Sequence, residues 1–91
     1  MRYLLDLADE IRQFVYNRYI KHAKEKGETN VTVISGTIHD EMRLKDRMPS
    51  VCQALRGKKF QTAYSVSLIQ EIRLPSVQLN SSTNRFFFRT D

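Results

Sequence analysis

The 91-residue chain contains one cysteine, three glycines, two prolines and no tryptophan. The single cysteine, Cys52, excludes an intrachain disulfide and favours a reducing compartment. Gly27, Gly36 and Gly57 are too dispersed to form a glycine-rich phosphate loop. The first apolar run ends at Asp6, far short of a signal peptide or a membrane span. We therefore expect a cytoplasmic protein that makes no contact with a membrane.

Residues suited to catalysis or metal binding are also scarce. His22 and His39 are the only histidines, and with a single thiol the chain has no zinc-binding pattern. The acidic pairs Asp9–Glu10 and Asp40–Glu41 are sequence neighbours, which point in different directions on a helix. We therefore expect no enzymatic activity, no metal site, no cofactor and no small-molecule substrate.

The composition is that of one small globular domain spanning residues 1–91. Hydrophobic residues make up 41% of the chain and charged residues 27%, a balance typical of a folded protein rather than a disordered one. The net charge is +5 and the isoelectric point about 9.7. This excess favours a polyanionic partner, of which nucleic acid and a membrane surface are the two kinds.

The positive charge is concentrated between residues 43 and 59. This segment has a single acidic residue, Asp46, among six basic ones. The basic residues are Arg43, Lys45, Arg47, Arg56, Lys58 and Lys59. A solvated basic surface is the simpler interpretation, but the concentration on one element favours a binding site.

The same region predicts two short amphipathic helices joined by a basic turn. Ile38 and Met42 have the spacing i, i+4, and four apolar residues then recur at i, i+3, i+4 and i+7. These four are Met48, Val51, Cys52 and Leu55. We expect the second helix to cover residues 46–57 and to bury Cys52, although a nucleophilic thiol is the alternative.

The boundaries of the two helices carry their own signals. Ser35 or Thr37 can cap the first helix, and residues 43–45 form the turn. Pro49 falls in the first turn of the second helix, where its missing N–H has no cost. Two helices with a turn of about three or four residues fit a helix-turn-helix, whose second helix can enter the DNA major groove.

The elements on either side are one long helix and three strands. The helix is expected over residues 4–26 with Gly27 after its end, and the strands over 31–34, 65–73 and 84–90. Alternation places Phe86 and Phe88 on one face of the last strand. In the middle strand it separates Val66, Leu68, Gln70 and Ile72 from Ser67, Ile69, Glu71 and Arg73. Residues 74–83 are expected to form the hairpin loop, and Phe60 to anchor the core.

The long helix begins with more apolar surface than one core contact requires. Leu4, Leu5, Leu7 and Ala8 spread around the helix instead of following one stripe. This run either covers the core or forms the contact of a homodimer. Both interpretations stay open from the sequence.

The order helix, strand, helix, helix, strand, strand resembles that of the winged helix-turn-helix family of bacterial and archaeal transcription regulators. The resemblance covers residues 11–89 and includes Leu44 before the paired core positions Val51 and Leu55. It implies an α+β fold of three helices and a small three-stranded antiparallel sheet. It further implies a small transcriptional regulator that reads double-stranded DNA with helix 46–57. The alternative is a winged-helix module that binds proteins in a larger assembly.

Helical geometry then assigns expected roles around the second helix. Four residues turn away from the apolar stripe, with Pro49 and Arg56 at the flanks. The four are Ser50, Gln53, Ala54 and Gly57. Gln53 can pair with adenine and Arg56 with guanine or phosphate, while simple exposure is the alternative for Ser50 and Gln53. The expected DNA-binding residues are Arg43, Lys45, Arg47, Ser50, Gln53, Arg56, Lys58 and Lys59. Arg73, Arg85 and Arg89 would join them if their face of the hairpin meets the duplex.

Overall fold

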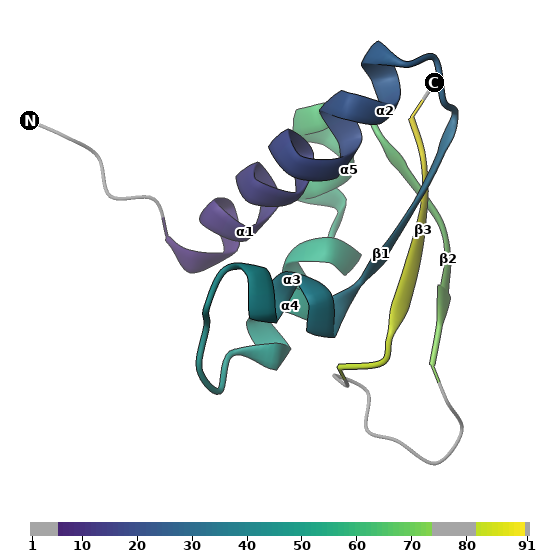
Figure 1. Ribbon diagram of the computed structural model, residues 1–91. Helices are drawn as coiled ribbons and strands as arrows, with labels where there is room; N and C mark the ends of the chain where they lie inside the picture. Colours follow the sequence, from purple (N-terminus) through teal and green to yellow (C-terminus); the bar gives the residue numbers. More distant parts are fainter. Residues whose placement is uncertain (1–5, 74–81, 91) are drawn as a thin grey trace, which may run out of the picture.

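A layer of helices packs against one face of a three-stranded antiparallel sheet (Figure 1). The computed structural model describes residues 6–73 and 82–90, and this part of the chain shows the predicted α+β class. The helical segments are α1 (Leu7–Val15), η1 (Tyr16–Ile20), α2 (Lys21–Glu25), α3 (Ser35–Glu41), α4 (Met48–Arg56) and α5 (Lys58–Tyr64). The strands are β1 (Asn30–Ile34), β2 (Ser67–Ile72) and β3 (Arg85–Arg89).

Segments α1, η1 and α2 follow one another without a break and form the expected long helix. Asp6 caps its start, since the Asp6 side chain accepts a hydrogen bond from the Asp9 N–H at 2.8 Å. The end is closed by Gly27, whose φ is +76°. The Glu28 N–H then bonds back to the Ala23 carbonyl at 2.8 Å, which gives a Schellman motif. Of the leucines considered for a dimer contact, Leu7 packs against the core, and Leu4 and Leu5 lie outside the described residues.

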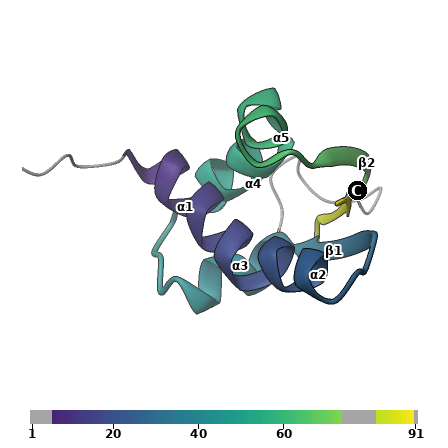
Figure 2. The ribbon, with the colours of Figure 1, turned by 90° about the horizontal axis from the view of Figure 1, so that it is seen from above.

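The sheet has the order β1-β3-β2, so β3 lies in the middle and pairs with both neighbours. The expected pairing of the first strand with the hairpin is therefore confirmed. Phe86 and Phe88 are fully buried against the helices, together with Val51, Leu55 and Phe60. All five were expected in one core. Figures 1 and 2 view the molecule at right angles to each other, and both show the helical layer on one side of the sheet.

Strand β2 departs from the expected alternation because it contains a β-bulge. Leu68 pairs with Phe88 and Gln70 with Phe87, so Ile69 is an extra residue without its own partner. Beyond the bulge, the faces are exchanged. Glu71 lies opposite buried Phe86 on the helical side, while Ile72 is on the other side and 41% exposed. The predicted grouping of Ile72 with Val66 and Leu68, and of Glu71 with Ser67, is therefore wrong.

The connection between α3 and α4 is longer than the expected turn. Helix α3 ends at Glu41 and α4 begins at Met48, so residues 42–47 link them instead of residues 43–45 alone. Arg43 and Asp46 have left-handed backbone conformations, with φ of 56° and 54°. Helix α4 is correspondingly shorter than the predicted 46–57. Pro49 does lie in its first turn, as expected.

Neither of the side chains expected to cap α3 does so. The helix begins directly after β1, with Ile34 at the cap position and no side-chain cap hydrogen bond. Its first N–H groups bond instead to backbone carbonyls just before β3. Ser35 N–H donates to the Asn84 carbonyl at 3.0 Å, and Gly36 N–H to the Ser82 carbonyl at 2.9 Å.

Helix α5 was not expected, because Gly57 was interpreted as the end of helical structure. Gly57 has a φ of −74° and instead serves as the junction from which α5 starts. Phe60 from α5 packs edge-on against Phe88, with 5.2 Å between ring centroids. Tyr64 stacks on Tyr16 at 4.6 Å, so α5 is held against the π-helical segment η1.

Two further expectations concern the hairpin loop and membrane-spanning helices. Residues 74–81 of the expected hairpin loop lie outside the described residues. Within the described ranges, none of the helices has the length and apolar character needed to cross a bilayer.

Candidate nucleic-acid interface

Helix α4 presents a narrow uncharged surface to solvent. Pro49 and Gln53 are exposed, and Ser50 is half-buried at the border. Ala54 was expected on this surface but is buried, because α1 packs along α4 and widens its covered side. The predicted outward position of Ala54 is wrong, whereas the outward position of Gln53 is confirmed.

The loop of residues 42–47 carries three exposed basic side chains beside the start of α4. They are Arg43, Lys45 and Arg47. The loop is held from below by Met42 and Leu44, which pack against the core. It is held at its end by His39, whose Nε2 accepts a hydrogen bond from the Arg47 backbone N–H at 3.2 Å. The backbone that carries the three basic side chains is therefore fixed at both of these points. His39 has a structural role, since it accepts one of the hydrogen bonds that hold the loop.

Arg56 turns away from the exposed surface of α4 toward strand β2. Its Nε donates to Glu71 Oε1 at 2.8 Å and its Nη2 to Glu71 Oε2 at 2.7 Å. The hydrogen bonds from Arg56 to this carboxylate raise the pKa of the guanidinium. The guanidinium carbon also lies 6.0 Å from the centre of the Phe86 ring. Arg56 thus joins helix to sheet, and its charge is matched inside the fold.

Lys58 and Lys59 differ in their surroundings, although both are exposed at the start of α5. Lys59 Nζ lies 3.3 Å from Asp9 Oδ1. The hydrogen bond from Arg12, followed by that from Lys59, holds the pKa of Asp9 below its ordinary value of 3.8. Part of the charge of Lys59 is therefore balanced by Asp9.

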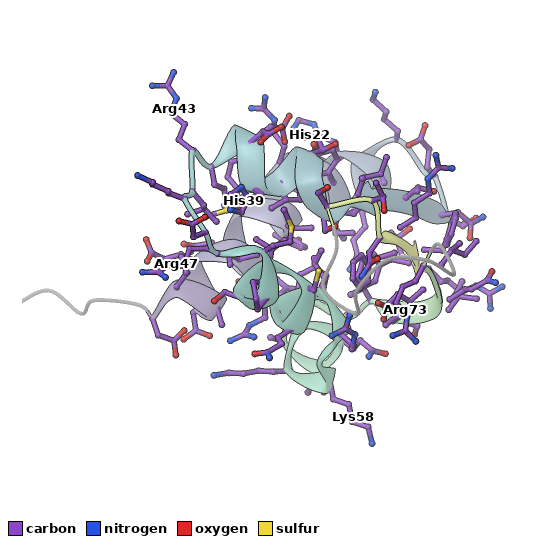
Figure 3. All side chains as sticks on the ribbon, turned by 90° about the horizontal axis from the view of Figure 1, so that it is seen from below. His22, His39, Arg43, Arg47, Lys58 and Arg73 are labelled. Carbon is purple, nitrogen blue, oxygen red and sulfur yellow. The ribbon has the colours of Figure 1, made fainter. Side chains whose placement is uncertain are left out.

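Figure 3 looks onto this side of the molecule and shows how the cations are distributed. In this view Arg47 lies to the left of α4 and Arg73 to its right, with Arg43 at the upper left of the molecule and Lys58 at its lower edge. Arg73 follows β2, and its Nε is 3.9 Å from Glu71 Oε2. In this view, basic residues from three separate parts of the chain form a border around α4.

Two of the hairpin arginines are not part of this border. Arg85 and Arg89 pair with residues of β1 and β2 on the sheet face opposite the helices. Glu71 was not singled out from the sequence, since simple alternation placed it on that opposite face. Its partnership with Arg56 depends on the bulge at Ile69, for which the sequence carries no clear signal.

The residues with catalytic or metal-binding chemistry are dispersed in the described part of the chain. There, no three His, Cys, Asp or Glu side chains are arranged to hold a metal ion. Cys52 is buried, as expected, and this burial raises the pKa of its thiol.

Comparison of the chain with known protein families, with curated proteins and with solved structures finds no match in any of the three.

Proposed function

We propose that this protein binds double-stranded DNA and presents α4 to the major groove, as a small winged helix-turn-helix regulator does. Apart from the additional helix α5 between α4 and β2, the element order supports this architecture, as does the sheet order β1-β3-β2. Helix α3 packs against α4 as the helix pair requires. The six-residue connection is longer than the usual turn. The proposal therefore draws on the arrangement of the elements rather than on the turn itself.

One observation carries the proposal: an uncharged strip on α4 is bordered by basic side chains from three parts of the chain. Pro49, Ser50 and Gln53 form the strip. A small uncharged surface can approach base edges closely, and the surrounding cations suit the two rows of phosphates that border a groove. Of the strip residues, Gln53 has the side chain that can pair with an adenine edge.

The proposed contacts differ from the sequence-based set at three positions, one of which is the addition of Arg73. Arg56 is assigned to the ion pair with Glu71 and not to a base. Lys59 is assigned a smaller share than Lys58, because Asp9 lies beside it. The proposed phosphate contacts are Arg43, Lys45, Arg47, Lys58 and Arg73.

A protein-interaction module is the second candidate. It is favoured by the same pairing of Arg56 and Lys59 with carboxylates, which reduces the positive charge available beside α4. Such a module would use the uncharged strip of α4 to contact a protein and would bind DNA weakly and without sequence preference.

Salt dependence of binding to a labelled duplex distinguishes the two candidates. Each lost phosphate contact makes the slope of log affinity against log salt shallower by roughly 0.9. We expect that change for Lys58→Gln on every duplex tested. Lys21→Gln, on α2 at the opposite end of the helical layer, is the matched charge control and should leave the slope unchanged (Figure 1).

Gln53→Ala tests base recognition separately. On a preferred duplex selected from a random pool, the variant should keep the salt slope and lose roughly 1–3 kcal/mol of discrimination at one base pair. Absence of duplex binding at low salt, where electrostatic attraction is strongest, refutes the DNA-binding proposal and leaves the interaction module.

A further inference from the structure

A small cavity lies between helices α1 and α5 and has a volume of about 170 Å³. The described residues that line it are Asp9, Arg12, Gln13, Lys59, Ala63 and Tyr64. None of them belongs to the uncharged strip of α4. A cavity of roughly 150 Å³ can hold a molecule the size of benzene, so this one has room for a small organic ligand.

Arg12 is the most buried residue of this lining. Its side chain is only 10% exposed, and one N–H of its Nη2 donates to Asp9 Oδ1. Within the described part of the chain, the N–H groups of Nε and Nη1 have no protein acceptor. They are not sealed from solvent either. These unused donors are therefore available to a ligand in the cavity.

The charges of the lining have a positive sum. Arg12 and Lys59 share one carboxylate, because Lys59 Nζ lies 3.3 Å from the same Asp9 Oδ1. Asp6 and Glu10, which flank Asp9 on α1, do not line the cavity. Two cations and one carboxylate leave one positive charge in excess, and a guanidinium with unused N–H groups is well suited to bind a carboxylate. The cavity therefore favours a ligand with a single negative charge.

The opposite part of the lining is apolar and held in place. The Tyr64 ring stacks on Tyr16 with 4.6 Å between the ring centroids. Lys24 Nζ donates to the Tyr64 carbonyl at 3.0 Å, which fixes the end of α5. Ala63 beside it has a short side chain and leaves space. A preformed wall with an aromatic ring favours a ligand with a flat apolar part.

We propose that this cavity binds a small aromatic carboxylate, with its carboxylate at Arg12 and Lys59 and its ring against Tyr64 and Ala63. A neutral aromatic molecule would leave the unused N–H groups of Arg12 without an acceptor, and an inorganic anion would leave the apolar wall uncovered. The site binds its ligand without converting it, and it does not depend on DNA binding by α4.

Benzoate is the probe for this site. In a titration followed by the backbone amide signals in NMR spectra, benzoate should shift signals of α1 and α5, and the shifts should saturate. Benzamide has the same shape without the charge, and acetate has the charge without the ring. Each should bind at least roughly 10-fold more weakly than benzoate, because each lacks one of the two kinds of contact.

Ala63→Leu tests the position of the ligand without changing any charge. The larger side chain should fill the cavity and abolish the saturable shifts. Thr62→Leu is the matched control, because it adds a leucine at the neighbouring exposed position of α5, which does not line the cavity. This variant should bind benzoate as the parent does.

Two charge variants should change the affinity for benzoate in opposite directions. Asp9→Asn removes the carboxylate that competes with the ligand and should tighten binding roughly 2- to 5-fold. Arg12→Gln should weaken binding at least roughly 10-fold. The NMR spectrum of each variant also shows whether it is folded. Equal affinity for benzamide and benzoate, or unchanged binding by folded Ala63→Leu, would overturn the proposal.

Discussion

Arg56 and Glu71 are joined at two points, Nε to Oε1 and Nη2 to Oε2, and this pair fastens the end of α4 to strand β2. The Arg56 side chain is 28% exposed and that of Glu71 is 13% exposed. The Asn84 side-chain amide also donates to Glu71 at 3.4 Å, which brings the start of β3 into the same cluster. One carboxylate therefore links α4, β2 and the residue that precedes β3.

Removing that carboxylate charge should destabilise the protein. Glu71→Gln leaves Arg56 partly buried without its counter-ion, and we expect a loss of about 1–3 kcal/mol in urea unfolding. A double-mutant cycle with Arg56→Gln should show coupling between the two positions. Additive effects would mean that the pair contributes nothing specific. In DNA binding, Arg56→Gln should leave the salt slope unchanged, because the guanidinium is held by Glu71.

Gly36→Ala should lower stability even though alanine is the better helix former. A β-carbon at this position would stand 2.6 Å from the Ser82 carbonyl oxygen, so helix α3 and the residues just before β3 would have to separate. We expect a cost of about 1–3 kcal/mol, seen as a lower melting temperature. Thr37→Ala, at the next position and exposed, should stay within roughly 0.5 kcal/mol of the parent. A raised melting temperature for Gly36→Ala would contradict the contact with Ser82.

Leu55→Ala tests the register of α4. Leu55 is fully buried, and its truncation should cost about 2–5 kcal/mol in urea unfolding. Gln53→Ala, on the exposed side of the same helix, is the control and should change stability little. Equal effects of the two substitutions would show that the buried side of α4 is assigned wrongly.

Asp9 should make stability depend on pH in the acid range. Its pKa in the folded protein is lowered by Arg12 and Lys59, so the folded state favours the ionised form. The stabilisation is present above pH 3.8 and is lost as the pH falls through the lowered value. The gap in melting temperature between the parent and Asp9→Asn should therefore close on acidification. Asp40→Asn, on α3, controls for the loss of one negative charge; a gap that stays constant with pH would refute the prediction.

Cys52 should be protected from thiol reagents in the folded protein. It is fully buried and burial raises its thiol pKa, which disfavours the reactive thiolate. Since access requires an opening of several kcal/mol, labelling at neutral pH should be at least about 100-fold slower than in urea. Rapid labelling without urea would argue against the packing of α4.

The parts of the fold that follow from local periodicity could be predicted from the sequence. Val51 and Leu55 lie one helical turn apart, and Phe86 and Phe88 share one face of a strand whose other face has Arg85 and Arg89 on either side of Phe87. Each pair therefore shows its buried side without knowledge of the partner. Gly27 ends its helix as expected, since a positive φ after a helix favours glycine.

The features that depend on distant contacts could not be predicted in the same way. Ala54 is buried only because α1 lies along α4, and the α3 start is capped by carbonyls near β3. The bulge at Ile69 is equally hidden, since apolar residues occur in both frames of the strand. Helix α5 did carry a signal in the i, i+4 spacing of Phe60 and Tyr64, which the glycine before it obscured.

The candidate site likewise has residues whose positions follow from the local sequence and residues whose contacts depend on distant segments. The positions of Arg43, Arg47 and Lys58 near α4 follow from their closeness in sequence to that helix. The ion pairs of Arg56 and Lys59 could not be predicted in this way, because their carboxylate partners belong to β2 and α1, which are distant in sequence. The positive charge that such a cluster offers to a partner can therefore be judged only after the ion pairs within the fold are known.

The central place of β3 in the sheet has a consequence for the order of folding. Strands β1 and β2 bond to β3 and not to each other, and β3 is the last of the three to leave the ribosome. Until residues 85–89 emerge, β1 has no strand to pair with and the first N–H groups of α3 lack their carbonyl partners. The helices can form early from local contacts, but the sheet must wait for distant ones. We therefore expect chains stalled before residue 85 to remain protease-sensitive on the ribosome and to become resistant once β3 is available.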